Sequence, residues 1–220
     1  MPTICKDVAT GSYLEVLRTF HPQLKPEDIW SLVCCGGDLH HPYEGWAGIV
    51  AYPVYSDARP FTLFFGEFTE QLMQWENVPE FRIERGTSKI QAFSDFRTYI
   101  TSVTNNPVFV SANAATWALR ILQEAIRLDT QGPWNAQLIC LRDLYSKTEN
   151  RLALERAGYI GQAFQKSPPL PKTFGLHKIG LVLGVEVPEL SDKATYRSQL
   201  TAECAYRLLE RVHPEETDED

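Results

Sequence analysis

The 220-residue chain lacks several features that define well-known classes of protein. No stretch approaches the roughly 18 uncharged apolar residues of a membrane-spanning helix. Residues 1–20 carry Lys6, Asp7, Glu15 and Arg18, so they contain no signal-peptide core. The five cysteines are an odd number, which is typical of reduced thiols rather than of a secreted disulfide framework. We therefore expect a protein of the cytoplasm or nucleus that does not associate with a membrane.

Basic residues are also in short supply. The chain has 21 Lys and Arg against 28 Asp and Glu, which gives a formal net charge of −7. Residues 1–80 hold four basic side chains against eleven acidic ones, whereas residues 151–180 hold five against one. Binding to nucleic acid depends on the neutralisation of phosphates. The overall balance therefore favours a protein partner, and the one basic stretch keeps single-stranded nucleic acid as an alternative.

The familiar catalytic and cofactor-binding motifs are missing. There is no Gly-rich phosphate loop, no Gly-x-Ser-x-Gly elbow and no His-Glu-x-x-His. Cys34, Cys35, Asp38, His40 and His41 lie within eight residues, but adjacent Cys-Cys and His-His pairs cannot easily all face one ion. We predict no metal site and no small-molecule cofactor, and we interpret this stretch as a turn.

The spacing of apolar residues predicts alternating strands and helices after a helical start. The expected helices are Ser12–Phe20, Lys25–Val33, Ser94–Val103, Thr116–Leu128, a short one near Arg142–Ser146, Leu176–Leu183 and Tyr196–Val212. The expected strands are Trp46–Tyr55, Pro60–Phe68, one within Phe81–Glu84, Val108–Ser111 and Ala136–Leu141. The prolines of Gln165–Lys172 predict an extended loop. Strands followed by alternating strands and helices indicate an α/β fold with a mixed sheet.

Two segments resemble the conserved blocks of the DEDD-type, DnaQ-like 3′–5′ exonucleases. The first is Val108–Leu122, in which Asn113-Ala114-Ala115 match the Asn-Ala-Ala of the family. The second is Phe174–Val185 with its Leu-rich helix, followed by Tyr196–Leu209 as the last helix. The resemblance covers roughly residues 46–212. It implies a ribonuclease-H-like mixed sheet flanked by helices, preceded by an N-terminal helical extension (residues 1–45) and followed by an acidic tail (213–220).

The residues that carry the chemistry of this family are replaced. Its first metal-binding pair, Asp-x-Glu, is best placed on Ile49–Tyr55, where it falls on Tyr52 and Val54. The later positions fall on Trp117, Tyr196 and Thr201, in place of an Asp, the general-base His and another Asp. Two-metal nuclease chemistry requires carboxylate ligands. The substitutions therefore predict a domain that is not an enzyme. A nuclease whose ligands moved to Glu67, Glu70, Asp95, Asp143 or Glu203 is the remaining catalytic alternative.

A domain that has the fold of a nuclease but lacks the catalytic residues is expected to act by binding. We predict a protein–protein interaction scaffold or adaptor within an assembly that handles nucleic acid. The alternative is a module for single-stranded RNA or DNA, with Trp117 as a stacking platform. The candidate contact residues are the aromatic and aliphatic residues of the N-terminal extension, Trp117 and the lysines beside the Pro-rich loop: Tyr13, Leu17, Phe20, Trp30, Trp117, Lys166, Lys172 and Lys178.

Overall fold

A computed structural model describes residues 23–36, 46–66, 68–112, 136–142, 175–186 and 192–210, together with Leu14, Arg18, Trp134, Leu144 and Tyr145. Four of the predicted segments lie outside this part of the chain: most of the helix Ser12–Phe20, the helix Thr116–Leu128, the loop Gln165–Lys172 and the acidic tail 213–220.

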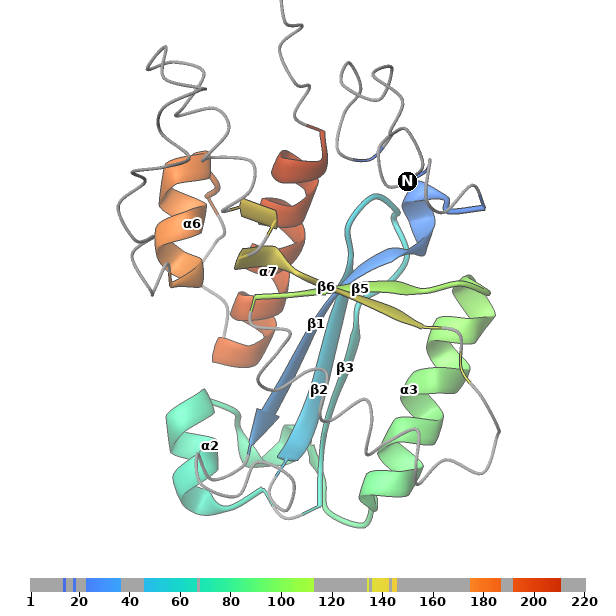
Figure 1. Ribbon diagram of the computed structural model, residues 1–220. Coiled ribbons are helices and arrows are strands. Elements are labelled where there is room, and N and C mark those ends of the chain that lie inside the picture. Colours follow the sequence, from blue (N-terminus) through green and yellow to red (C-terminus); the bar gives the residue numbers. More distant parts are fainter. Residues whose placement is uncertain are drawn as a thin grey trace, which may run out of the picture.

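The described residues form an α/β structure around one six-stranded mixed sheet (Figure 1). The strands are β1 (Ile29–Gly36), β2 (Trp46–Pro53), β3 (Phe61–Phe65), β4 (Ile83–Glu84), β5 (Val108–Ser111) and β6 (Gln137–Cys140), in the order β4-β3-β2-β1-β5-β6. Strands β1, β2 and β3 are antiparallel neighbours, whereas β5 runs parallel to β1 and β6 runs parallel to β5. The predicted mixed sheet flanked by helices is therefore confirmed at the level of an α/β fold.

The start of the sheet differs from the sequence-based expectation. Lys25–Val33 was predicted as a helix because a proline and two acidic residues precede an apolar run. Only Pro26–Asp28 (η2) makes a single 3-10 turn, and the following residues form β1. An apolar run that is buried on both faces of a sheet has no helical or alternating period. Because β1 lies between β2 and β5, the predicted helical extension does not hold for Ile29–Gly36.

One face of the sheet is covered by α3 (Lys89–Val103), which begins at the N-cap Ser88 (Figure 1). The layer between α3 and the sheet is rich in aromatic side chains. Trp134 packs edge-on against three phenylalanines, with ring centroids 5.6–5.9 Å apart. The buried members of this layer are Trp30, Leu32, Ile49, Ala51, Leu63, Phe65, Ala92, Phe93, Phe96, Ile100 and Phe109.

The opposite face is covered by α7 (Lys193–Leu209), which packs on β1, β2 and β5, with α6 (Leu176–Leu183) against it. Apart from Leu200, the buried residues of α7 before its last turn are small: alanine, serine, threonine and cysteine. At Gly180 of α6, a Cβ atom would come within 2.8 Å of Leu200 Cδ1, so glycine allows the two helices to approach closely.

A short helix that the sequence analysis missed, α2 (Glu70–Glu76), precedes the 3-10 turn η3 (Glu80–Arg82) and β4. The Thr69 side chain caps α2 by accepting a hydrogen bond from the Leu72 N–H, and Asn77 ends it in the left-handed conformation. Val78 and Ile83 of this segment belong to the same buried cluster as Phe64 of β3 and Ala194 of α7, so the segment packs on the same face of the sheet as α7. It therefore lies next to the start of α7 (Figure 1).

Candidate functional site

The contact between β1 and α7 is the candidate functional site, because the resemblance places catalytic carboxylates on the opening strand and on the last helix. Strand β1 reads Ile-Trp-Ser-Leu-Val-Cys-Cys-Gly and contains no acidic residue. Helix α7 contains one, Glu203, which is exposed. At the contact itself the two elements present hydroxyl groups, Ser31 from β1 and Ser198 from α7, whose oxygens lie 2.8 Å apart.

The two serines belong to a closed hydrogen-bond network. Both side chains are completely buried. Ser198 Oγ donates to the Val50 carbonyl oxygen at 3.2 Å, and the Tyr52 N–H donates to Ser31 Oγ at 3.1 Å. Buried hydroxyl groups are costly unless they are paired in this way. The network joins β1, β2 and α7 without leaving a charge at their crossing.

The predicted family positions lie around this network rather than in it. Tyr52 is the register partner of Ser31, and its half-buried side chain packs beside the α2 segment. Burial, and next the nearby Asp192 carboxylate, raise the pKa of the Tyr52 phenol. Val54 follows β2, and its N–H donates to the Ile29 carbonyl oxygen. The assignment of Asp-x-Glu to Ile49–Tyr55 therefore falls on the second strand of the sheet, since β1 is the first.

The structure describes both residues of the last helix that the resemblance aligns with catalytic positions, Tyr196 and Thr201. Thr201 is buried one turn after Ser198, and its Oγ1 donates to the Arg197 carbonyl oxygen at 2.7 Å. Tyr196 is half-buried and packs against the cluster formed by α6, α7 and β5. Neither side chain offers a carboxylate to the contact with β1. Trp117 lies outside the described residues.

Among the predicted contact residues, Trp30 can be placed. Its side chain has no exposed surface and packs edge-on against Tyr99 beneath α3, so it is a core residue rather than a surface anchor. Its neighbours in the predicted helix, Ile29 and Leu32, are buried in the same strand. Lys178 lies on α6, but its side chain is outside the described part. The other predicted contact residues lie entirely outside the described part of the chain: Tyr13, Leu17, Phe20, Lys166 and Lys172.

A second polar cluster, which the sequence analysis missed, joins the start of α7 to α2 and η3. Arg197 Nη2 contacts both oxygens of the Glu76 carboxylate at 2.8 Å. Arg82 Nη1 lies 2.6 Å from Asp192, whose other oxygen accepts the Thr195 N–H as the N-cap of α7. The spacing of Asp192 and Thr195 is a local capping signal. The ion pairs of Arg197 with Glu76 and of Arg82 with Asp192 join residues that are far apart in the sequence, so no local pattern predicts them.

Both carboxylates of this cluster are buried, and a thiol lies among them. The Glu76 side chain is 4% exposed and that of Asp192 is fully buried. Burial, and next the Glu76 carboxylate, raise the pKa of the Cys35 thiol well above its usual range. On the opposite face of β1, burial raises the pKa of Cys34 to about 12. A thiol with a raised pKa stays protonated and is a poor nucleophile.

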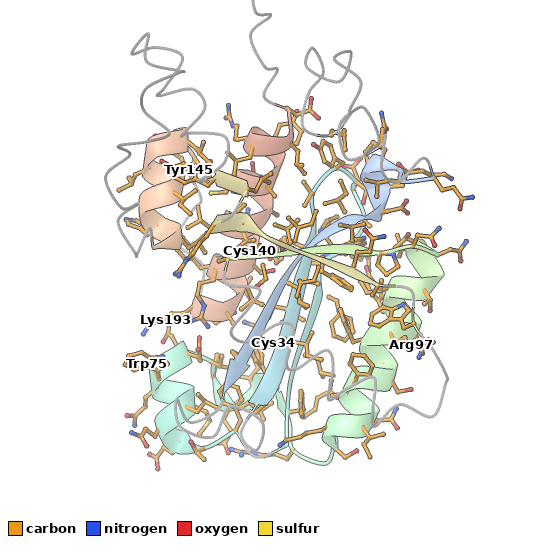
Figure 2. All side chains as sticks on the ribbon, in the orientation of Figure 1. Cys34, Trp75, Arg97, Cys140, Tyr145 and Lys193 are labelled. Atoms are coloured by element: carbon orange, nitrogen blue, oxygen red, sulfur yellow. The ribbon has the colours of Figure 1, made fainter. Side chains whose placement is uncertain are left out.

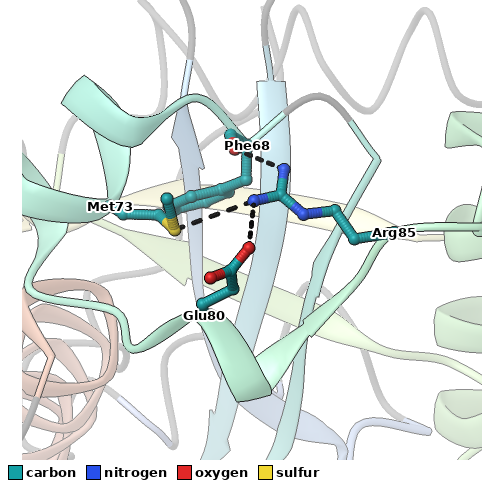
Figure 3. A network of polar contacts seen from close by, with 4 residues as sticks. All are labelled: Phe68, Met73, Glu80 and Arg85. Atoms are coloured by element: carbon teal, nitrogen blue, oxygen red, sulfur yellow. Dashed lines mark hydrogen bonds and ion pairs between the residues drawn. The ribbon is translucent and has the colours of Figure 1, made fainter.

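Arg85 makes a third set of contacts in the same region, nearer to solvent (Figure 3). Its guanidinium group donates to the Phe68 carbonyl oxygen at 2.8 Å and contacts Glu80 at 3.3 Å and the Met73 sulfur at 3.9 Å. These contacts tie α2 to η3. The described residues contain no group of three or more His, Cys, Asp and Glu side chains placed to hold a metal ion.

No protein-family model and no curated protein matches the chain. Within the described part of the chain, no helix is both long enough and apolar enough to cross a membrane.

Proposed function

We propose that this chain is a non-catalytic, exonuclease-like domain that acts by binding another protein, as a scaffold or adaptor in an assembly that handles nucleic acid. The observation that carries the proposal is the contact between β1 and α7. The resemblance requires carboxylates there, and the contact holds two mutually hydrogen-bonded serines, Ser31 and Ser198. The Asp-x-Glu pair was placed on β2, whereas the first strand in the chain is β1. The inference that the carboxylates are absent is the same for both, because neither strand contains an acidic residue.

The hydrogen-bond geometry adds to this support. A metal-binding centre needs oxygen ligands that are oriented toward an ion and released from competing partners. Here each hydroxyl group is used to join backbone and helix: Ser31 accepts from Tyr52, and Ser198 donates to Val50. The mixed sheet with helices on both faces is compatible with the ribonuclease-H-like core that the resemblance implies.

The choice of protein over nucleic acid rests on charge. The net charge of −7 opposes the approach of a phosphate backbone. The experiment is to measure binding of labelled single-stranded DNA and RNA at low and at physiological salt by fluorescence anisotropy. We expect no saturable binding at physiological salt. Saturable binding that weakens steeply with salt, and that is lost in Lys166→Ala/Lys172→Ala, would favour the nucleic-acid module instead.

The scaffold role itself is tested by reconstitution. A partner captured from the native cell and identified by mass spectrometry should form a stoichiometric complex with the purified chain in the absence of nucleic acid. Nuclease treatment during capture is the control, because it removes proteins that are held only through a shared RNA or DNA. A complex that disappears after this treatment, and that cannot be rebuilt from the two proteins, would contradict the proposal.

A further inference from the structure

Two large aromatic side chains of the α2–β4 segment (residues 69–87) are exposed to solvent. Trp75 on α2 is 66% exposed and Phe81 on η3 is 87% exposed. Single exposed apolar residues are common on protein surfaces, but tryptophan and phenylalanine with this much exposed area are typical of contact surfaces. Phe81 lies six positions after Trp75 in the chain, which spans at most about 20 Å at full extension, so one partner segment can reach both.

Both side chains are presented from backbone that buried ion pairs hold in place. Trp75 is next to Glu76, whose carboxylate is bound by Arg197 of α7. Phe81 is next to Arg82, which binds Asp192 at the start of α7. Arg85 joins the two halves of the segment through Glu80 and Met73 (Figure 3). An aromatic residue whose position is already fixed loses little conformational entropy when it binds, which is the condition for a binding hot spot.

The charges of the segment indicate what it would bind. It holds two arginines against four glutamates, a balance of −2. Arg82 is paired with Asp192, Arg85 with Glu80 and Glu76 with Arg197. Glu70 and Glu84 are exposed and have no ion-pair partner among the described residues. These carboxylates oppose a phosphate backbone and also a second copy of the same acidic surface, and they attract a basic side chain.

Trp75 already has a cation on its ring. Lys193 of α7 places its ammonium nitrogen 4.8 Å from the ring centroid, and both side chains lie on the same side of the molecule (Figure 2). This contact fixes the orientation of the indole relative to α7 and leaves most of its surface open. The α2–β4 segment therefore carries two exposed aromatic side chains and two exposed carboxylates, on backbone that ion pairs tie to α7.

We propose that the α2–β4 segment, through its exposed Trp75 and Phe81, is a docking surface for a basic, amphipathic segment of a partner protein. Apolar side chains of that segment would cover Trp75 and Phe81, and its lysines or arginines would approach Glu70 and Glu84. This inference rests on the proposed function, because it takes the partner to be a protein. It adds the surface of this chain that the partner would contact and the chemistry of the partner segment.

The test uses the full chain and three labelled probes: a short amphipathic peptide of leucine and lysine, the same peptide with glutamate for lysine, and an oligo(U) RNA. The lysine peptide should bind the wild type in fluorescence anisotropy, and the other two probes should bind far more weakly. Trp75→Ala/Phe81→Ala should weaken binding of the lysine peptide by about tenfold or more. Glu70→Gln/Glu84→Gln should weaken it by a smaller factor that vanishes at high salt.

Two controls separate docking from general effects. Ile90→Ala removes a half-exposed apolar side chain from α3, on the other face of the sheet, and should leave the affinity for the lysine peptide unchanged within about twofold. Circular dichroism should show that every variant keeps the wild-type fold, since the substituted side chains are exposed.

Four results would overturn the docking surface: no binding of the lysine peptide, equal binding by Trp75→Ala/Phe81→Ala, preferential binding of the RNA, or a dimer in sedimentation that this double variant abolishes. If a reconstituted partner complex survives the double variant, the scaffold role stands and only this surface is wrong. Preferential binding of the RNA, in contrast, would count against the proposed function as well.

Discussion

The two faces of the sheet are held by different kinds of contact. Beneath α3 the interior is apolar and aromatic, with Phe96, Phe109 and Trp134 packed ring against ring. Beneath α7 an apolar cluster that includes Ile29, Leu200 and Leu208 is joined by the hydroxyl contact between β1 and the helix, and two ion pairs with buried carboxylates tie the start of the helix to α2 and η3. The α3 face depends on shape and volume, whereas the α7 face depends in addition on polar groups that must be satisfied.

The difference bears on the proposed function. The resemblance to DnaQ-like exonucleases would place catalytic carboxylates under the last helix, and the contact of α7 with β1 has hydroxyl groups there. Two buried carboxylates on this face, Glu76 at the end of α2 and Asp192 at the start of α7, are neutralised by arginines. They act in packing α2 and η3 against α7 rather than at the contact with Ser31.

Deletion of residues 1–44 has the largest expected effect, because it removes β1, the strand that both faces share. Without β1, strands β2 and β5 lose their common neighbour, and both layers lose the surface on which they pack. We expect the truncated chain to show no cooperative unfolding transition by circular dichroism. A truncated chain that melts cooperatively near the wild-type temperature would mean that β1 is not part of the core.

Phe96→Ala measures how far the α3 face depends on volume. Phe96 is fully buried and contacts Phe61, Phe93, Phe109 and Trp134. The cavity should lower the free energy of unfolding by about 3–5 kcal/mol in urea titrations. Phe81→Ala is the matched control, since the same atoms are removed from a side chain that is 87% exposed, and it should change stability by less than about 0.5 kcal/mol.

Glu76→Gln probes the ion pairs of the α7 face. The substitution removes the charge opposite Arg197 but keeps the size of the side chain. We expect a loss of about 2 kcal/mol, less than for a fully buried pair because the Arg197 side chain is 38% exposed. Glu80→Gln, which breaks the exposed pair with Arg85, should cost less than about 1 kcal/mol. Equal costs for the two variants would show that burial does not distinguish these pairs.

Among the substitutions of buried residues, Ser198→Ala has the smallest expected effect on stability. It removes one hydroxyl from the network, leaving the Val50 carbonyl oxygen without that donor and Ser31 without its partner on α7. A loss of about 1–2 kcal/mol should appear in urea titrations. A double-mutant cycle with Ser31→Ala should give a non-additive result, because the two hydroxyl groups are hydrogen-bonded to each other. Additive losses would contradict the 2.8 Å contact.

Local sequence signals predicted several elements well. The strand Val108–Ser111 and the helix Leu176–Leu183 have the predicted bounds. The reason is local in each case: a short β-branched run follows Asn105-Asn106-Pro107, and a Leu-rich stretch is closed by Gly184 in the left-handed conformation. The helix α3 begins at Lys89, five residues before the predicted Ser94, and its N-cap is Ser88.

The polar contacts of the α7 face could not be predicted in the same way. Ser31 and Ser198 are 167 residues apart, and Glu76 and Arg197 are 121 residues apart. No local pattern marks a serine or a glutamate as the partner of a residue at that distance. The error at β1 had the opposite cause: Pro26, Glu27 and Asp28 form a strong local signal for a helix start, and the sheet overrode it after a single turn.

The most direct measurement is a degradation assay with purified chain, magnesium or manganese, and end-labelled single-stranded DNA or RNA. The contact of Ser31 with Ser198 provides no carboxylate for a metal pair, so we predict that every substrate stays at full length. A matched preparation of Glu67→Ala, which removes the carboxylate expected at the end of the second predicted strand, should behave identically. Processive trimming from the 3′ end that requires the metal and is lost in Glu67→Ala would contradict the account.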